Sequence, residues 1–351
     1  HALVSGGMSD GPRIVVAGAG AIGCFIGGLL AGAGHSVTLL ARPRIQAEIR
    51  THGLTLTDFG GMARYLSADD LTLAGDETCL RDADIVLVTV KSRDTENIAR
   101  QIARHSAQGV QVISLQNGMG NRAILAQHLP QHDLRAGLVP FNVVAMGQGC
   151  YHRASSGDLV IEGGPADLAA RLSLPDLKVV EHADITALQW GKFLMNLNNA
   201  LNALSGLPLQ AQLQDRAWRR LMADQWAEAL AILRAEKIRP AMTTPIPARL
   251  VPALLRLPTP LFSRIASAML QIDPQARTSM AQDLAALRPT EIDALQGEVQ
   301  RRGQALGRAT PVTDMVLRVM GWAELAGEGL PHLPVTALGA EMAAGQDQQE
   351  G

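Results

Sequence analysis

Residues 13–42 read RIVVAGAGAIGCFIGGLLAGAGHSVTLLAR: an apolar run, a glycine-rich turn, a run of small residues and a second apolar run. This order predicts strand, turn, helix and strand, the setting in which a G-x-G-x-x-G pattern indicates dinucleotide binding. Gly18 permits the tight turn, Gly20 lets backbone N–H groups approach a pyrophosphate, and Gly23 lets the helix pack against its strand. The predicted cofactor-binding turn comprises Gly18, Ala19, Gly20, Ala21, Ile22 and Gly23.

The second apolar run ends at Arg42, and Arg44 follows two residues later. NAD-specific sites usually place Asp or Glu at this point to bind the ribose 2′-hydroxyl, whereas an arginine accommodates the 2′-phosphate of NADP. A guanidinium group can hold a phosphate with two hydrogen bonds. No carboxylate lies between Arg42 and Glu48. The pattern therefore predicts NADP (NADPH) as the cofactor, bound through Arg42. The alternative is that both arginines are solvated loop charges.

Composition and charge narrow the class of protein. The chain has 351 residues, enough for two domains, and a formal net charge of −2, which gives no reason to expect nucleic acid or an anionic membrane surface as partner. Its three cysteines are widely spaced and suggest neither a disulfide framework nor a zinc site, so we expect no metal. We find no signal peptide and no apolar stretch of membrane-spanning length. We expect a soluble, cytoplasmic protein.

Further apolar runs continue the strand pattern. Residues 84–90 and 110–115 are short and rich in β-branched residues, and residues 95–105 between them have helical spacing. Strands that alternate with helices predict a parallel sheet, in which ligands bind beyond the carboxyl ends of the strands. Lys91 and Asn117 follow two such strand ends. We therefore expect them to meet the glycine turn and Arg42 at one crevice.

The character of the chain changes near residue 185. Residues 138–161 suggest further strands with glycine turns, whereas the later sequence is nearly all helical, rich in Ala, Leu, Arg and Gln and interrupted by prolines. The predicted fold class is α/β, with an N-terminal Rossmann-type parallel-sheet domain followed by an all-helical C-terminal domain. The expected parts are a vector-derived remnant and disordered start (1–12), an NADP-binding domain (13–183), a helical substrate and catalytic domain (184–338) and a disordered, Gln-rich acidic tail (339–351).

One predicted helix, residues 187–202, combines dense apolar residues with polar ones. At about 100° per residue, Asn196 and Asn199 lie within roughly 40° of Lys192 around the helix axis, so the three form one polar stripe. Asn198 and Asn202 project elsewhere. A stripe of this kind on an apolar helix costs stability unless its groups are satisfied or functional. We favour a functional stripe; a stripe that simply faces solvent is nearly as well supported by geometry alone.

A second polar cluster begins at Ser279 and continues beyond Pro289. The proline should kink or restart the helix. Thr290 can cap the new segment, which places Glu291 in its first turn, where a carboxylate is favoured. Taken alone, this cluster is equally typical of a capped surface helix.

Together these motifs resemble ketopantoate reductase (2-dehydropantoate 2-reductase), over residues 13 to about 326. The matching segments are Gly18 to Gly23, Lys91, Gln116-Asn-Gly-Met-Gly120, Trp190-Gly-Lys-Phe-Leu-Met-Asn196 and Leu287-Arg-Pro-Thr-Glu-Ile-Asp293. The resemblance implies a Rossmann domain, a helical domain and an active site in the cleft between them. It implies reduction of ketopantoate to pantoate with NADPH, a step of pantothenate and coenzyme A biosynthesis.

The resemblance also implies roles for individual residues. Lys192 would be the general acid that protonates the carbonyl oxygen, with a pKa lowered by burial, and Glu291 would help set its state. Carried over in the same way are Asn196, Asn199 and Ser279 for the substrate, Asn117 for the substrate and the nicotinamide end of the cofactor, and Lys91 for the cofactor phosphates or ribose. The family usually has its second asparagine eight residues after the lysine, where this chain has Ala200; Asn199 is the nearest candidate.

Two alternatives keep the fold and change the function. The first is reduction of a different 2-keto acid or a phosphorylated substrate; the asparagines of the stripe favour a carboxylate and a hydroxyl over a phosphate. The second is a non-catalytic NADPH sensor, which would not need Lys192 or Glu291. We expect a small 2-keto acid as the partner and a monomer or homodimer.

Overall fold

The computed structural model describes residues 11–267 and 270–347. The chain divides into two compact units, with the boundary between Ile185 and Thr186, two residues after the predicted one. The first unit contains all the strands of the described residues, and the second consists of helices. The predicted class, a parallel-sheet domain followed by a helical domain, is confirmed.

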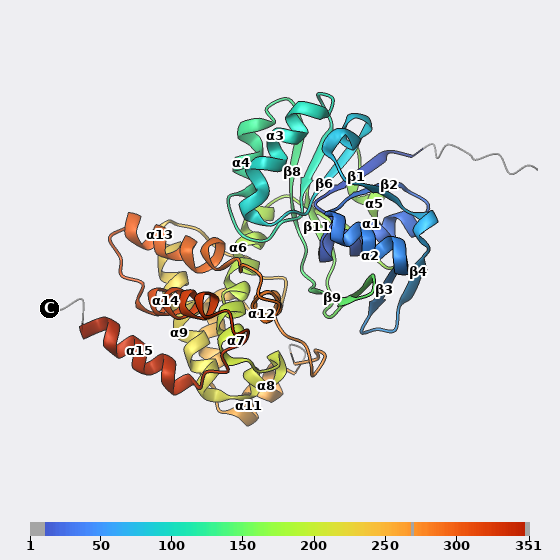
Figure 1. Ribbon diagram of the computed structural model, residues 1–351. Coiled ribbons are helices and arrows are strands. Elements are labelled where there is room, and N and C mark those ends of the chain that lie inside the picture. Colours follow the sequence, from blue (N-terminus) through green and yellow to red (C-terminus); the bar gives the residue numbers. More distant parts are fainter. Residues whose placement is uncertain (1–10, 268–269, 348–351) are drawn as a thin grey trace, which may run out of the picture. The chain divides into compact units, whose positions relative to one another are not determined.

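The first unit is built on an eight-stranded sheet with the order β12-β11-β8-β7-β6-β1-β2-β5 (Figure 1). Its strands are β1 (Arg13–Ala17), β2 (Ser36–Leu40), β5 (Thr72–Ala74), β6 (Ile85–Val88), β7 (Gln111–Ser114), β8 (Asp133–Leu138), β11 (Leu159–Glu162) and β12 (Val179–His182). All neighbouring pairs are parallel except β8–β11. The order reverses at β1, because the chain moves to β2 and β5 on one side and to β6 on the other.

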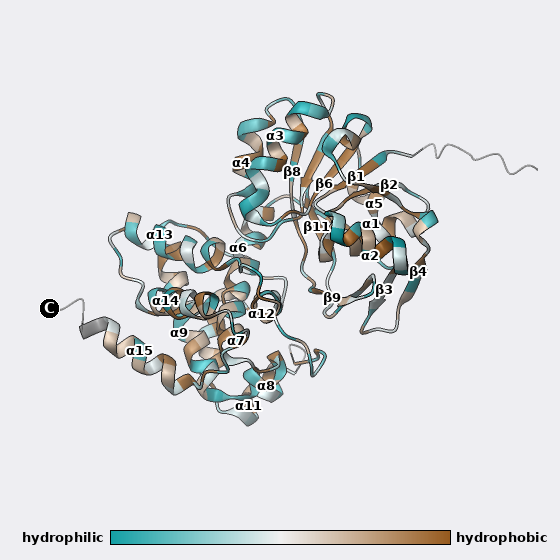
Figure 2. Cartoon of the chain, in the orientation of Figure 1, coloured by the Kyte–Doolittle hydropathy of each residue, from teal (hydrophilic) through white to brown (hydrophobic). Residues whose placement is uncertain are grey.

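Helices cover both faces of this sheet, so its central strands are buried on both sides. In β1, Ile14 and Val16 belong to one apolar core, whereas Val15 and Ala17 belong to the other. Figure 2 shows the strands as the most hydrophobic part of the unit. The helices are α1 (Ala21–Gly32), α2 (Pro43–His52), α3 (Thr95–His105), α4 (Asn121–His128) and α5 (Leu168–Leu172), with short 3₁₀ turns at Ala68–Asp70, Glu77–Asp82 and Ser92–Asp94. Buried β-branched runs of this kind are typical of parallel sheets.

A second, four-stranded sheet was not predicted as such. Its order is β4 (Ala63–Leu66), β3 (Leu54–Asp58), β10 (Cys150–Arg153) and β9 (Val143–Gly147). It packs on α1: a Cβ at Gly28 would lie 2.6 Å from a methyl group of Leu54. Helix α1 is therefore enclosed between two sheets, which explains why its sequence is small and apolar all round.

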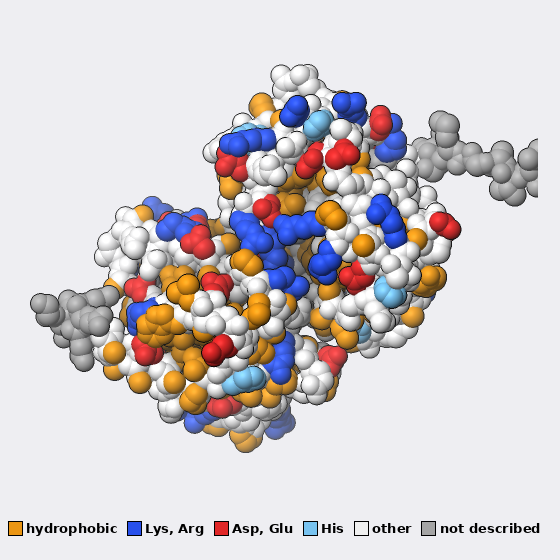
Figure 3. Space-filling model, viewed as in Figure 1, with side chains coloured by type: hydrophobic (Ala, Val, Ile, Leu, Met, Phe, Trp, Pro, Cys, Tyr) orange, Lys and Arg blue, Asp and Glu red, His pale blue; other side chains and the backbone are white. Residues whose placement is uncertain are grey.

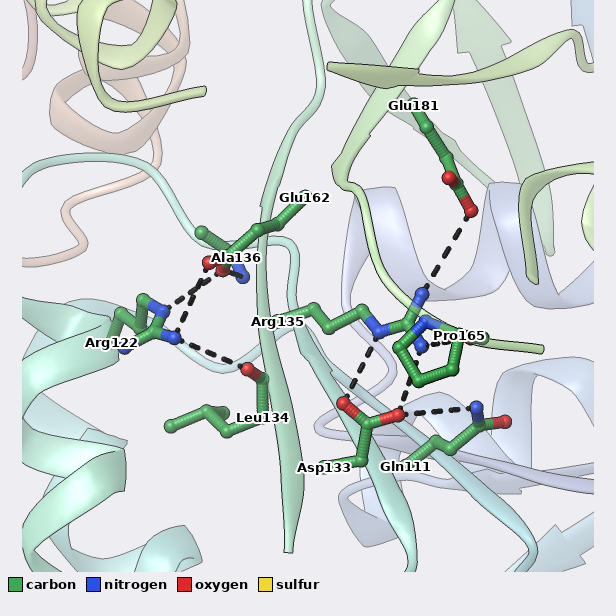
Figure 4. Close-up of polar contacts among 9 residues, drawn as sticks. All are labelled: Gln111, Arg122, Asp133, Leu134, Arg135, Ala136, Glu162, Pro165 and Glu181. Atoms are coloured by element: carbon green, nitrogen blue, oxygen red, sulfur yellow. Dashed lines mark hydrogen bonds and ion pairs between the residues drawn. The ribbon is translucent and has the colours of Figure 1, made fainter. Parts of the chain in front are cut away.

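A buried arginine fastens the antiparallel edge of the main sheet (Figure 4). Arg135 on β8 is 2% exposed and bonds the Asp133 carboxylate at 2.9 and 3.2 Å. It also donates to the Pro165 carbonyl and lies 3.8 Å from Glu181 on β12. A Cβ at Gly164 would lie 2.9 Å from the guanidinium carbon, so a larger residue there would require the arginine to shift. This arginine joins β8 to the end of β11 and to β12.

The second unit is a helical bundle. Its helices are α6 (Ile185–Asn196), α7 (Asn198–Ser205), α8 (Leu209–Gln214), α9 (Arg216–Ala235), α10 (Val251–Arg256), α11 (Thr259–Ile265), α12 (Ser279–Ala285), the π-helix η5 (Asp293–Gly297), α13 (Glu298–Ala305), α14 (Pro311–Ala326) and α15 (Val335–Asp347), with a 3₁₀ turn at Ala248–Leu250. Within its described residues the unit contains no strand, as predicted. None of the described helices is long and apolar enough to cross a membrane.

The prediction of a disordered tail from residue 339 is wrong as far as Asp347, because α15 continues to that residue. This helix packs on α14, where Arg318 donates to the Glu341 carbonyl at 2.9 Å, and its Leu338 is fully buried. The Ala, Met and Glu residues of this segment favour a helix. The prediction of disorder gave more weight to the glutamines at the end of the chain. Residues 1–10 of the predicted disordered start (1–12) and the last four residues of the predicted tail lie outside the described residues.

Candidate active site

The glycine turn after β1 has the backbone that its sequence requires. Gly18 has φ +88°, and a Cβ there would lie 2.2 Å from a methyl group of Val90. A Cβ at Gly23 would lie 2.6 Å from the Thr89 hydroxyl, so α1 can approach its sheet only with glycine at this position. At Gly20, by contrast, the nearest atom to an added Cβ would be a backbone oxygen at 4.0 Å. The fold itself therefore explains Gly18 and Gly23 but not Gly20.

Hydrogen bonds hold this turn at the reversal of strand order, between β1 and its neighbours. The amides of Gly18 and Ala19 donate to the Leu40 carbonyl at 3.1 and 2.9 Å, and the Thr89 hydroxyl donates to the Gly18 carbonyl at 2.9 Å. Helix α1 begins directly after Gly20. The amide groups of its first turn have no acceptor within the helix and point, with the positive end of the helix dipole, beyond the strand ends.

Arg42 lies at the carboxyl end of β2 and precedes the first residue of α2. Its guanidinium is 75% exposed and lies 3.4 Å from the Asp94 carboxylate, which belongs to the loop after β6. Arg44 is equally exposed and pairs with Glu48 at 3.6 Å, one turn along α2. Only Arg42 is thus linked to the neighbouring strand loop, and both side chains are accessible to an anionic ligand.

Lys91 and Asn117 follow β6 and β7, as predicted, and a polar network connects their loops. The Asn117 carbonyl accepts hydrogen bonds from the Ser92 hydroxyl at 3.0 Å and the Asn121 amide at 2.8 Å. Gln116 donates to the Val90 carbonyl at 3.1 Å. The glycine turn, Arg42, Lys91 and Asn117 therefore occupy connected loops along one edge of the sheet. Figure 3 shows charges of both signs scattered over the drawn face of this unit.

In the second unit, α6 carries Lys192 between buried residues. Trp190, Phe193 and Leu194 are all at most 3% exposed, and Lys192 is itself partly buried. The segment around Ala241 passes close to α6 at Gly191, where an added Cβ would lie 1.9 Å from the Ala241 carbonyl oxygen. The amide of the same residue, Ala241, donates to the α6 backbone at 2.9 Å. The glycine before the lysine thus lets a second segment pack directly on the helix.

The surroundings of Lys192 perturb its acidity. Burial lowers the pKa of Lys192 from its usual 10.5 to about 8, and the Glu291 carboxylate acts in the opposite direction. The lysine from α6 and the glutamate that precedes η5 are thus close enough to interact, although 99 residues separate them in sequence. An amine with a lowered pKa beside a carboxylate is suited to proton transfer near neutral pH.

The remaining predicted residues of this unit, Asn196, Asn199 and Ser279, lie on α6, α7 and α12. Asn196 and Asn199 are both partly buried, one on α6 and one on α7. Thr278 caps α12 and donates from its hydroxyl to the Asn199 carbonyl at 3.1 Å, which places the next residue, Ser279, close to α7. Thr278 was not predicted; its only local signal in the sequence is a threonine at the position of a helix cap.

The other two asparagines of this segment are structural, in agreement with their predicted direction. Asn198 and Asn202 both donate to the Gln212 side-chain oxygen on α8, at 3.1 Å each. Asn202 and Gln212 are fully buried. This triad fastens α7 to α8 and explains why so many asparagines occur on an apolar helix.

The helix restarts after Pro289 as predicted, but Glu291 lies just before the new helix and not in its first turn. Thr290 accepts at its hydroxyl from the Ile292 amide at 3.4 Å and donates to the Glu324 carboxylate of α14. Glu291 itself lies one residue before the first helical residue, and its carbonyl accepts from Ala294 at 3.1 Å. The helix then begins as a π-helix over Asp293–Gly297, a form that is rare and frequent at functional sites.

Among the described residues, no group of three or more His, Cys, Asp and Glu side chains could hold a metal ion. The donor groups of the two units are instead backbone amides, arginine and lysine cations, amides and hydroxyls. Their N–H and O–H groups can donate hydrogen bonds to anions and to carbonyl or hydroxyl oxygens.

Comparisons with known proteins agree with this arrangement. The family model described as ketopantoate reductase PanE/ApbA matches residues 14–165, and that of its C-terminal part matches residues 184–323. The 2-dehydropantoate 2-reductase of Halobacterium salinarum is 30% identical over 309 residues, which cover 86% of this chain and 95% of that protein. The 2-dehydropantoate 2-reductase of Mycobacterium tuberculosis is 28% identical over 324 residues, 88% of this chain and 97% of that protein.

Solved structures show the same relationship. The crystal structure of a PanE/ApbA family ketopantoate reductase from Ralstonia eutropha has a TM-score of 0.76 and 31% identity, and the match covers 90% of this chain and 99% of the other. A D-mandelate dehydrogenase in complex with NADH shares the fold, with a TM-score of 0.72 and 22% identity over 90% of this chain and 99% of the other. The two family models together span the glycine turn and the lysine helix, and the chain belongs to the ketopantoate reductase PanE/ApbA family of oxidoreductases.

Proposed function

We propose that this protein reduces ketopantoate to pantoate with NADPH, and that Lys192 donates the proton. The observation that carries the proposal is the lowered pKa of Lys192, about 8, next to Glu291. At pH 7 a group with this pKa is about nine-tenths protonated, so the acid form prevails while its proton is held far less tightly than in an ordinary lysine. The same ammonium stabilises the negative charge that develops on the carbonyl oxygen.

The first unit supplies the cofactor site. When bound, the reduced nicotinamide supplies the hydride that adds to the 2-keto carbon. The residues present fit the pyrophosphate of such a cofactor, because an added Cβ at Gly20, beside the first turn of α1, would meet no protein atom closer than 4.0 Å. A glycine that the fold does not require is explained by the close approach of a ligand. The amides of Ala21, Ile22 and Gly23 would bind the phosphate oxygens there, and Lys91 would add a positive charge.

Arg42 supports NADPH over NADH. Its exposed guanidinium at the end of β2 occupies the place where a carboxylate would select the 2′-hydroxyl of NAD. The Asp94 carboxylate holds the Arg42 side chain toward the loop after β6. In the complex, the 2′-phosphate would replace this carboxylate as the partner of Arg42.

The second unit supplies the groups that would bind the keto acid. Asn196, Asn199 and Ser279 offer neutral amide and hydroxyl donors for the substrate carboxylate and hydroxyl. Asn117 of the first unit would contact the nicotinamide end and the substrate. After the proton leaves Lys192, the nearby Glu291 carboxylate favours its return to the charged form, since an opposite charge raises the pKa of an amine.

The direct test is an NADPH-oxidation assay with ketopantoate, a panel of other 2-keto acids, and NADH as the control cofactor. We expect turnover with ketopantoate and a marked preference for NADPH. Faster turnover of another acid would replace the substrate and retain the chemistry, and the seven-residue spacing from Lys192 to Asn199 makes this the second candidate. Tight NADPH binding with no turnover of any acid would refute the enzyme in favour of an NADPH-binding regulator.

A further inference from the structure

The helix that carries Lys192 is interrupted five residues later. Helix α6 ends at Asn196 and α7 begins at Asn198, so the predicted single helix is divided at Leu197. The Leu197 carbonyl accepts two side-chain hydrogen bonds from distant elements, one from Gln225 of α9 at 3.0 Å and one from Gln296 of η5 at 2.8 Å. Two amides therefore hold the joint that lies between the predicted substrate residues Asn196 and Asn199.

The orientation of Gln296 is strongly determined. Its side chain is fully buried, and its Nε2 donates both to Leu197 and to the Gln225 oxygen, the latter at 3.0 Å. Rotating the amide by 180° would turn its oxygen toward two acceptors, so only this orientation is possible. As a result, the Gln296 oxygen has no hydrogen-bond partner among the described residues. A buried polar atom without a partner is costly, and such an atom in a native fold calls for an explanation.

The positions of these residues suggest the explanation. Leu197 lies five residues after Lys192, and Gln296 lies five residues after Glu291. The Leu197–Gln296 hydrogen bond thus joins the segment that carries the lysine to the segment that carries its carboxylate. The π-helix alters the helical repeat at the turn that carries Gln296, whose side chain reaches Leu197.

We propose that Gln296 and Gln225 are positioning residues that set the separation of Lys192 and Glu291 by clamping the Leu197 carbonyl. This inference rests on the proposed role of Lys192 as the acid. Glu291 is the charged group that acts on the lysine. The nearest turn of α13 presents Arg302 to the Trp190 ring, and Arg302 is paired with Glu236 and Glu298. Loss of the clamp removes part of the influence of Glu291 without adding another charge.

The test compares Gln296→Met and Gln225→Met with the wild type, by the pH dependence of kcat/KM for the keto acid. Gln300→Met is the matched control, because Gln300 lies one turn later and bonds Asp314 of α14 at 2.7 Å, away from the Leu197 joint. Thermal unfolding is measured for every variant, so that lost stability is separated from a changed site. The two clamp variants lie on different helices, so either one that folds carries the test.

We expect the clamp variants to lose about tenfold or more in kcat, because catalytic groups must be held to within less than 1 Å. The pKa that limits activity at high pH should move downward, because the lysine loses support from Glu291. Gln300→Met should leave that pKa unchanged. A clamp variant that loses stability but keeps the wild-type pKa and kcat would refute the positioning role. If Lys192→Ala also left turnover intact, the proposed function itself would fail, which is a separate outcome.

Discussion

A substitution of Gly191 by alanine tests whether the segment that crosses α6 is fixed as described. The new Cβ would lie 1.9 Å from the Ala241 carbonyl oxygen and 2.9 Å from its carbon. Ordinary contact begins at 3.4 Å, so the crossing segment must retreat by about 1.5 Å. A retreat of this size breaks the 2.9 Å hydrogen bond from the Ala241 amide to the Ala187 carbonyl.

The expected magnitude follows from these changes. Forced overpacking costs about 1–3 kcal/mol and the lost hydrogen bond about 1 kcal/mol. Alanine recovers about 1 kcal/mol through its higher helix propensity, so Gly191→Ala should lower the free energy of unfolding by about 1–3 kcal/mol. The matched control is Gly321→Ala on α14, where an added Cβ would meet nothing within 4 Å. That variant should gain up to about 1 kcal/mol.

Urea unfolding followed by tryptophan fluorescence measures both values in the relevant part of the molecule. All four tryptophans of the chain lie in the helical unit, at positions 190, 218, 226 and 322. A Gly191→Ala protein as stable as Gly321→Ala would show that the crossing segment is not packed on α6 at this point. The surroundings of Lys192 would then differ from those described above.

Three further predictions concern the cofactor and the proton. In a fluorescence titration, Arg42→Gln should weaken NADPH binding about 10–100-fold, the loss expected for a charge-assisted hydrogen bond, and leave NADH binding unchanged. An equal loss of affinity for both cofactors would contradict a contact between Arg42 and the 2′-phosphate. Gly20→Ala should weaken NADPH binding at unaltered thermal stability, whereas Gly18→Ala should lower the unfolding temperature, because only the latter has φ +88° and a clash at 2.2 Å. Since the acid must be protonated, kcat/KM should be constant below the Lys192 pKa of about 8 and fall above it. Glu291→Gln should move this fall to lower pH, because the carboxylate raises the pKa of the lysine. If the variant leaves the fall at the same pH, Glu291 is not the partner of the lysine.

Local sequence patterns were sufficient for the parts of the fold that depend on neighbouring residues. The strand, glycine turn and helix from residue 13 follow from apolar periodicity and from the need for glycine at Gly18. Helical spacing predicts that Lys192 lies on a helix, and Pro289 and Thr290 predict the helix restart near Glu291. These features are encoded within a few residues of one another.

Features that depend on distant residues were not accessible from the sequence. The second sheet pairs β3 with β10 across about a hundred residues, and its strands are short and half exposed. The buried Arg135 was not identified, because its partners Pro165 and Glu181 come from later segments. At the interruption, the Leu197 carbonyl accepts a hydrogen bond from Gln296, which no local pattern connects with it. In each case the stabilising contact is formed only in the folded chain.

The central claim, that the amine of Lys192 delivers the proton, is tested most directly by the turnover number of Lys192→Ala with ketopantoate and NADPH. We predict a decrease in kcat of about 10²–10⁴-fold, the usual contribution of a general acid, while NADPH binds as tightly as to the wild type. Wild-type turnover in this variant would contradict the claim, whatever the affinity for the cofactor.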